Sequence, residues 1–296
     1  MELFVQQICN GLALGSLYAL FGLGFGLVFS TLGILNLAHG TFATWGALIC
    51  IWLMVHINVP LLVAVPLALL GAGLVGVLVD ELGFQPLRRR SELVIPSIIT
   101  SIGALIVLEG VARIVSDAQV LRFPSNAVPN GRLGWGWLRV SWPQAGSILS
   151  LVVVSVLLYF LLNRTRFGLA MRAVGRDRGA ASLAGVNARI VTLTTALLAG
   201  AAAGLAGILM GLSTNNVTFM LGDGLLLKGF AAVVVGGAGD VRGTVIAGLF
   251  LGVAEVLTGQ YGSASYQDIV SFGLLIVFLV FRPGGIFKSD VTAERA

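Results

Sequence analysis

Residues 8–33, ICNGLALGSLYALFGLGFGLVFSTLG, contain no charged side chain and decide the fold class. A helix of this length covers the hydrocarbon core of a bilayer, which takes about 20 apolar residues. The stretch lacks the alternation of apolar and polar residues that marks an outer-membrane β-strand. We therefore predict a membrane-spanning α-helix here.

The whole chain has the composition of an integral membrane protein. Of its 296 residues, 57% are hydrophobic and 10% are charged, and the mean hydropathy is +0.99. So few charges cannot cover the surface of a soluble protein of this size. We predict a single all-α transmembrane domain over residues 1–296, a polytopic bundle of about 8–10 helices. The apolar runs are 8–33, 41–55, 61–80, 94–115, 145–162, 190–211, 224–238, 243–259 and 266–282.

Two of these runs, 41–55 and 224–238, are short for a full span. Such segments occur as broken or re-entrant helices, whose ends lie inside the bilayer. Gly-bounded polar breaks stand near 33–40 and near 236–243, which suggests two related halves. The alternative is that these breaks occur without a repeat, because glycine is common in membrane helices.

Lysine and arginine are distributed unevenly over alternating loops, and this distribution predicts the orientation. We place the richer set in the cytoplasm with the C-terminus and the 163–189 loop, and the N-terminus and the 116–144 loop in the periplasm. The richer set is Arg88, Arg89, Arg90, Arg164, Arg166, Arg172, Arg176, Arg178, Arg189, Arg242, Arg282, Lys288 and Arg295. The opposite set is Arg122, Arg132 and Arg139, with Lys228 near a boundary.

The segment 33–40, GILNLAHG, interrupts two apolar runs with polar groups. Asn36 and His39 could hydrogen-bond backbone groups freed at a helix break, or they could line a substrate path. The alternative is that Asn36 caps the next helix while His39 and Gly40 lie at the headgroup boundary. We take Asn36, His39 and Gly40 as candidate residues of a substrate path.

Residues 163–189, NRTRFGLAMRAVGRDRGAASLAGVNAR, form a loop much longer than the usual helix connection of about two to eight residues. Apolar residues are interleaved there with arginines, so we predict helices that lie in the plane of the membrane interface. The small residues and the acid among the arginines favour docking of a soluble partner over contact with lipid headgroups. The candidate docking residues are Arg172, Asp177, Ala180, Ala181 and Gly185.

Glycine is concentrated in residues 233–243, VVVGGAGDVRG. The spacing is not GxGxxG, and GxxxxGK[ST] occurs nowhere in the chain, so we do not predict a phosphate-binding loop. We predict instead a tight cytoplasmic helix hairpin at Gly236, Gly237 and Gly239. Pairs of glycines four residues apart predict close helix packing; they are Gly200 and Gly204, Gly207 and Gly211, and Gly248 and Gly252.

Few ionisable residues fall within the spans. Glu109 and Arg113 stand four apart on one helical face, and we predict that they pair. Glu255 could snorkel to the interface, meet Lys228 or face a cavity. The sequence contains no HExxH, no nucleophile elbow and no paired carboxylates on one helix face, so we predict neither a catalytic nor a metal site. The basic residues are too dispersed for nucleic-acid binding.

Four stretches occur in order along the chain: GLVFSTLGILNLAHG at 26–40, MRAVGRDRGAASLAGVNARIV at 171–191, GFAAVVVGGAGDVRGTVIAG at 229–248 and RPGGIF at 282–287. Together they resemble the LivH-like permease subunits of branched-chain amino-acid ABC importers. The resemblance implies that residues 168–189 fit a groove on an ATPase subunit. Ala180, Ala181 and Gly185 keep the Ala-Ala-x-x-x-Gly core of the importer coupling motif, whereas Gly179 stands where that motif prefers Glu.

The resemblance also implies the partners and the location of the chain. They are a second homologous permease, two cytoplasmic ATPases, a periplasmic substrate-binding protein and the lipid of a bacterial inner membrane, with no cofactor. We predict a non-enzymatic permease for branched-chain amino acids. The alternatives are an ABC permease for urea, short amides or other amino acids, and a stand-alone secondary transporter. The latter predicts ion-coupling acids at the midplane and gives no role to the 163–189 loop.

Overall fold

The structure is a computed structural model, and it describes residues 1–88, 94–125, 127–128, 132–135, 138–282 and 284–286. Seven helices of the described chain are long and apolar enough to cross a membrane. The prediction of an all-α polytopic membrane protein is confirmed. Several residues used in the sequence predictions lie outside the described ranges, namely Arg89, Arg90, Pro283, Phe287, Lys288 and Arg295.

The helices fall into long spans, two shorter apolar helices and the elements of the loops. The spans are α1 (Glu2–Leu32), α3 (Leu61–Val79) continued by η1 (Asp80–Phe84) and α4 (Gln85–Arg88), α5 (Val94–Val115), α6 (Trp142–Arg164), α9 (Ala188–Thr214), α11 (Val241–Tyr261) and α12 (Gln267–Phe281), which follows η2 (Ala264–Tyr266). The shorter helices are α2 (His39–His56) and α10 (Leu221–Gly236). The loop elements are β1 (Arg132–Trp135), β2 (Leu138–Ser141), α7 (Arg166–Arg176) and α8 (Arg178–Leu183).

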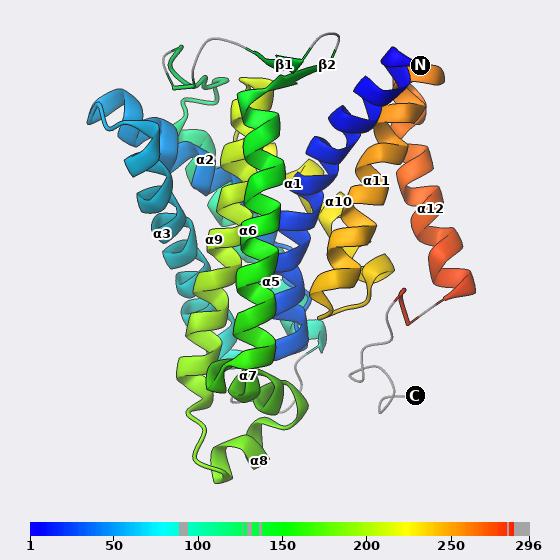
Figure 1. Cartoon of the computed structure of the whole chain (residues 1–296). Coiled ribbons are helices and arrows are strands. Elements are labelled where there is room, and N and C mark those ends of the chain that lie inside the picture. Colours follow the sequence, from blue (N-terminus) through cyan, green and yellow to red (C-terminus); the bar gives the residue numbers. More distant parts are fainter. Residues whose placement is uncertain (89–93, 126, 129–131, 136–137, 283, 287–296) are drawn as a thin grey trace.

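Helix α1 runs from the end of the bundle that carries the β1–β2 hairpin to the end that carries α7 and α8, whereas α9 runs the opposite way (Figure 1). Each of these long helices is followed by a non-helical linker, 33–38 or 215–220, and then by a short helix, α2 or α10. The two short helices correspond to the runs for which we predicted broken or re-entrant helices. The predicted match of 33–40 with 236–243 is wrong, because 236–243 is the turn between α10 and α11 and the counterpart of 33–38 is 215–220.

Small residues allow α1 to lie at the centre of the bundle, where 83% of its apolar span is buried. A Cβ on Gly15 would lie 2.6 Å from the carbonyl oxygen of Gly248, so no larger residue fits between α1 and α11. Added Cβ atoms on Gly46 and Gly207 would overlap the backbone of Gly204 and Ala43. Five of the six glycines in the predicted seams therefore contact a neighbouring helix, whereas Gly211 faces the side chains of Val217 and Phe123 outside the helices.

A charged cluster joins α1, α10, α11 and α12. Lys228 Nζ lies 2.5 Å from Glu255 Oε1 and 3.1 Å from Asp268 Oδ1, and the Tyr18 hydroxyl donates to Glu255 Oε2 at 2.9 Å. Of the three alternatives for Glu255, the structure shows the contact with Lys228. The side chains of Glu255 and Lys228 are 7% and 17% exposed, so each buried charge needs the other as its counter-ion.

The predicted pairing of Glu109 with Arg113 is wrong. In the described chain no ion pair joins them; Arg113 lies over the Phe219 ring, 5.7 Å from its centroid, and the Glu109 carboxyl group is within hydrogen-bonding reach of Asp223. Residues 219 and 223 flank the start of α10, a segment far away in sequence. The contacts that Glu109 and Arg113 make with this distant segment therefore replace the local i,i+4 pair.

We predict that Glu255→Gln destabilises the purified protein by about 3 kcal/mol, because it leaves the Lys228 ammonium group without its buried counter-ion. Asp268→Asn is the control, since Asp268 is 70% exposed and an exposed pair is worth about 0–1 kcal/mol. The measurement is the thermal unfolding midpoint in detergent. Equal midpoints for the two variants would contradict the pairing.

Candidate functional site

The first candidate site is the break between α1 and α2. Helix α1 ends at Leu32 and is capped by Gly33, whose φ of 64° is favoured by glycine and whose N–H donates to the Phe29 carbonyl at 2.9 Å. The chain then turns back, because the His39 ring at the start of α2 contacts Phe21 and Phe25. These two residues lie about 10–16 Å along α1 from its end. Helix α2 therefore begins in the interior of the bundle.

Asn36 holds this linker together. Its side-chain Oδ1 accepts the Ala38 N–H at 3.0 Å, and its backbone carbonyl accepts the His39 N–H at 3.2 Å. The side chain is 5% exposed. Asn36 thus satisfies backbone donors at the start of α2, which is the predicted role of hydrogen-bonding backbone groups at a helix break. Its contact with a substrate stays a prediction.

His39 lies in a cage of aromatic rings. Edge-to-face contacts join its ring to Phe21, Phe25 and Phe42, with centroids 4.9, 5.6 and 5.3 Å away. The residue is fully buried, and neither ring nitrogen has a hydrogen-bond partner of normal geometry. This burial does not fit a position at the headgroup boundary. A buried polar group without a partner costs stability, so His39 is a poor choice for packing alone.

Helix α10 begins where α2 begins. The Gly222 N–H donates to Thr44 Oγ1 at 3.0 Å, and an added Cβ on Gly40 would lie 3.1 Å from the Gly222 carbonyl oxygen. The two short helices run from this contact in opposite directions. Their N-terminal ends, which carry partial positive charge, therefore meet in the middle of the bundle. Gly40 is part of this contact, and its place in a substrate path stays a prediction.

The second candidate site is the pair of helices α7 and α8, which occupies the predicted docking loop. Asp177 caps α8 by accepting the Ala180 N–H at 2.9 Å, and the Arg172 guanidinium donates to the Leu162 carbonyl. Ala181 is 4% exposed and faces the bundle, so it supports the helix from inside. Gly185 has a φ of 83° and open space around it.

The most exposed apolar residue of these helices is not among the predicted docking residues. Leu183 is 93% exposed, and Leu169 on α7 is 62% exposed. Met171 and Val174 on the other side of α7 are buried against the bundle. Leu183 lies between Ala181 and Gly185 in the sequence, so its position among these small residues could have identified it as a docking residue.

Ion pairs fasten this end of the bundle. Arg88 pairs with Asp80, and Arg189 at the start of α9 pairs with Glu81 in η1. The Asp80 and Arg88 side chains are 4% and 7% exposed. Helices α7 and α8 are followed closely by α9, which the Arg189 pair connects to η1 at the end of α3.

The hairpin predicted at Gly236, Gly237 and Gly239 is the turn between α10 and α11. Gly237 and Gly239 have φ values of 101° and 91°, which L side chains rarely adopt. The Asp240 side chain caps α11 by accepting the Gly243 N–H at 2.8 Å. The turn is tight enough for the backbones of Gly236 and Gly243 to touch.

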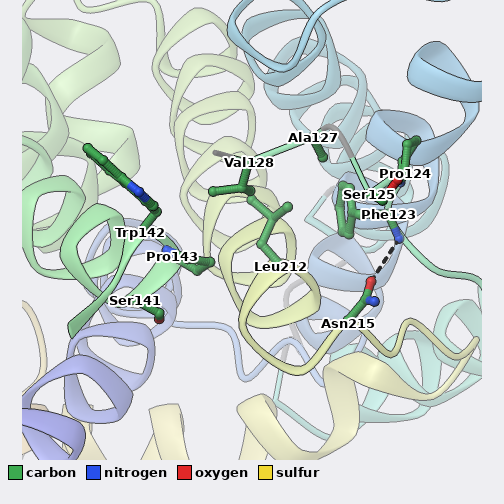
Figure 2. A pocket seen from close by; sticks show the side chains of 10 residues that line it. All are labelled: Phe123, Pro124, Ser125, Ala127, Val128, Ser141, Trp142, Pro143, Leu212 and Asn215. Carbon is green, nitrogen blue, oxygen red and sulfur yellow. Dashed lines mark hydrogen bonds between the residues drawn. The ribbon is translucent and has the colours of Figure 1, made fainter. Parts of the chain in front are cut away.

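A pocket of about 400 Å³ opens at the opposite end of the bundle (Figure 2). It lies between the segment after α5, the start of α6 and the end of α9, and Asn215 fixes its wall by accepting the Phe123 N–H at 3.2 Å. The sequence does not indicate this pocket, because its walls come from three distant segments. The lining residues are Phe123, Pro124, Ser125, Ala127, Val128, Ser141, Trp142, Pro143, Leu212 and Asn215.

Spanning helices, two shorter helices that meet inside the bundle and amphipathic helices at one end define a membrane transport subunit. A family profile described as the permease component of branched-chain amino acid transport systems matches residues 7–279. The chain belongs to this family.

Named relatives cover nearly the whole chain. The high-affinity branched-chain amino acid transport system permease BraD of Pseudomonas aeruginosa is 31% identical over 96% of this chain and 95% of its own. The LivH permeases of the corresponding systems are 33% identical in Salmonella typhimurium and 32% identical in Escherichia coli, with the same coverage.

We predict that Gly222→Ala reduces the amount of folded protein and the transport activity, because the added methyl group overlaps the Gly40 backbone. Gly224→Ala is the matched control, since nothing lies within 4 Å of a Cβ at that position on the same helix. Monodisperse protein in detergent extracts measures the first effect and uptake the second. A normal Gly222→Ala protein would contradict the contact between α2 and α10.

Proposed function

We propose that the chain is the permease subunit of an ATP-driven importer that carries branched-chain amino acids across a bacterial inner membrane. The names of its relatives support this substrate class. The observation that carries the proposal is the meeting of two helix N-termini inside the bundle, at Gly40 and Gly222. A transporter needs such polar backbone at membrane depth, whereas a purely structural bundle does not.

The break suits a zwitterion with a small apolar side chain. The partial positive charges at the starts of α2 and α10 attract a carboxylate without placing a fixed charge in the membrane. The surroundings, Gly40, Gly222 and the Phe21, Phe25 and Phe42 rings, are apolar, as an aliphatic side chain requires. Asn36 shapes this segment by holding the linker, and His39 supplies the one polar side chain of the aromatic cage.

Helices α7 and α8 are the element that docks onto the ATPases. Leu183, Ala180 and Gly185 are exposed and form a small apolar knob, which suits insertion into a protein groove. Rotation of these helices would move α9, and the Arg189–Glu81 pair would pass that movement to α3. The ATPases then supply the free energy, and this chain supplies the path.

In this assembly the α7–α8 end is cytoplasmic, together with the C-terminus, because arginine is concentrated there. The N-terminus and the pocket near Trp142 face the periplasm. The periplasmic binding protein delivers its ligand at that face, where the pocket, about 400 Å³ in volume, offers a concave surface. A second homologous permease and two ATPases complete the transporter.

We predict that Leu183→Asp abolishes uptake of radiolabelled leucine by the co-expressed transporter while the permease stays in the membrane. The side chain is 93% exposed, so the change affects a partner and not the fold of this chain. Leu183→Met, which keeps the apolar contact, should retain uptake. Co-purification of the ATPases measures docking, and normal co-purification with Leu183→Asp would contradict the docking role.

We predict that His39→Leu raises the thermal stability by about 1 kcal/mol, because it removes a buried polar group without a partner, and that it lowers uptake. Phe42→Leu, a neighbour in the same cage, should lower stability and keep uptake per folded molecule. The readouts are the unfolding midpoint and leucine uptake normalised to membrane protein. Parental uptake by His39→Leu would show that the imidazole has no part in transport.

A further inference from the structure

The linker 215–220 connects two parts of the molecule that lie at different depths. Helix α9 ends at Thr214, at the end of the bundle that carries the pocket, whereas α10 begins at Leu221, next to the central contact of Gly222 with Gly40. A chain of six residues extends over at most about 20 Å. A displacement of its first residues is therefore carried to α10 and is not absorbed along a long loop.

The segment that follows α5 holds this linker by its backbone. The Leu121 N–H donates to the Val217 carbonyl and the Val217 N–H donates to the Leu121 carbonyl, both at 2.9 Å, as in an antiparallel β-bridge. The Phe123 N–H donates to Asn215 Oδ1 at 3.2 Å. Val217 is fully buried and packs with Phe123 in one hydrophobic cluster. Three hydrogen bonds and this apolar contact thus fix the linker to a segment far away in the sequence.

The backbone conformation of Asn215 suits this role. Its φ of 49° lies in the left-handed region, where a helix usually ends in glycine and less often in asparagine. Glycine would end α9 equally well, but it could not accept the Phe123 N–H. The asparagine side chain therefore ties the two segments together in addition to ending the helix.

Further contacts follow the linker toward α10. Arg113 in the last turn of α5 lies over the Phe219 ring, and the Glu109 carboxyl group lies beside Asp223 in the first turn of α10. One stretch of chain, 109–123, thus accompanies the linker from its first residue to the start of α10. A movement of this stretch changes the position of α10 relative to α2.

The pocket gives a docked protein access to this contact. Phe123 and Asn215 both line the pocket, and Figure 2 shows the Asn215 side chain reaching the Phe123 backbone at its edge. A protein that docks at this end of the bundle therefore meets both partners of the hydrogen bond. Each hydrogen bond contributes little net free energy, because water competes for the same groups, so a docked partner can open it.

We propose that Leu121, Phe123, Asn215 and Val217, together called the linker contact, transmit the docking of the periplasmic binding protein to the start of α10. This inference rests on the proposed function. Docking displaces Phe123, the hydrogen bonds carry the displacement to the linker, and the linker moves α10 away from α2, which opens the central break. Asn215 is a positioning residue, since it acts through the linker and does not touch the amino acid.

The first test locks the linker contact with a disulfide between Leu121→Cys and Val217→Cys, in the assembled transporter without Cys9 and Cys50. Opposite residues of such a bridge have Cα atoms about 5.5 Å apart, which is within the range of disulfides. The control is Gly134→Cys with Arg139→Cys, a pair of opposite residues in the β1–β2 hairpin at the same end of the bundle. The readouts are binding of the leucine-loaded binding protein and the ratio of ATP hydrolysis with that protein to hydrolysis without it.

We expect the 121–217 cross-link to leave the binding protein bound and to lower this ratio several-fold, toward one, until a reductant restores it. The control cross-link should keep the parental ratio. A parental ratio in the cross-linked 121–217 protein would overturn the inference. Loss of binding would overturn it too, because the contact would then belong to the docking surface alone, and failure to cross-link would contradict the β-bridge.

A second test removes one hydrogen bond without a cross-link. Asn215→Gly keeps the left-handed conformation and removes the acceptor, so we expect a several-fold lower ratio, whereas Asn215→Asp keeps an oxygen acceptor and should stay near the parental ratio. Asn216→Gly is the matched control, since the Asn216 side chain is exposed and makes no hydrogen bond within the described residues. Equal ratios for the two glycine variants would contradict the role of Asn215. A parental transporter that its binding protein does not stimulate would contradict the proposed function as well.

Discussion

A peptide group inside a bilayer must find its hydrogen-bond partner within the protein, and this constraint governs the centre of the bundle. Two helices begin there, and each helix start leaves N–H groups without partners in the helix. Asn36 Oδ1 accepts the Ala38 N–H and Thr44 Oγ1 accepts the Gly222 N–H. These side chains make a break at this depth stable, so the chain can place polar backbone where a substrate passes.

The same helix starts in the middle of the bundle explain why small residues are so frequent in the chain. Two short helices, their linkers and a largely buried α1 fit into one bundle only where backbones touch, as at Gly40 with Gly222 and at Gly15 with Gly248. The outer spans have no such neighbours and carry large aliphatic side chains toward lipid.

The sequence predicted the parts of the fold that depend on local composition. The length and charge of each apolar run predicted the spans, and the shortness of 41–55 and 224–238 predicted the two broken helices. The family resemblance pointed to 26–40, where the structure places the break. These features are local because a bilayer imposes the same requirement on every spanning segment.

The parts that the sequence did not predict depend on contacts between distant segments. The linker 215–220 reads NNVTFM and the linker 33–38 reads GILNLA. The two share no sequence pattern, although both precede a short helix. The i,i+4 spacing suggested a Glu109–Arg113 pair, but the fold places Glu109 beside Asp223 and Arg113 over the Phe219 ring of another segment. The pocket near Trp142 likewise forms only when three segments come together.

The most direct test of the central break is a disulfide between Gly40→Cys and Leu226→Cys in a background without Cys9 and Cys50. A Cβ at position 40 lies 3.3 Å from Leu226 Cβ, close to the distance of about 3.5–4.5 Å in disulfides. If α2 and α10 meet here and the path opens between them, oxidation cross-links the two cysteines and stops leucine uptake, and reduction restores uptake. Absence of the cross-link, or parental uptake by the cross-linked protein, would contradict the central position of this break in transport.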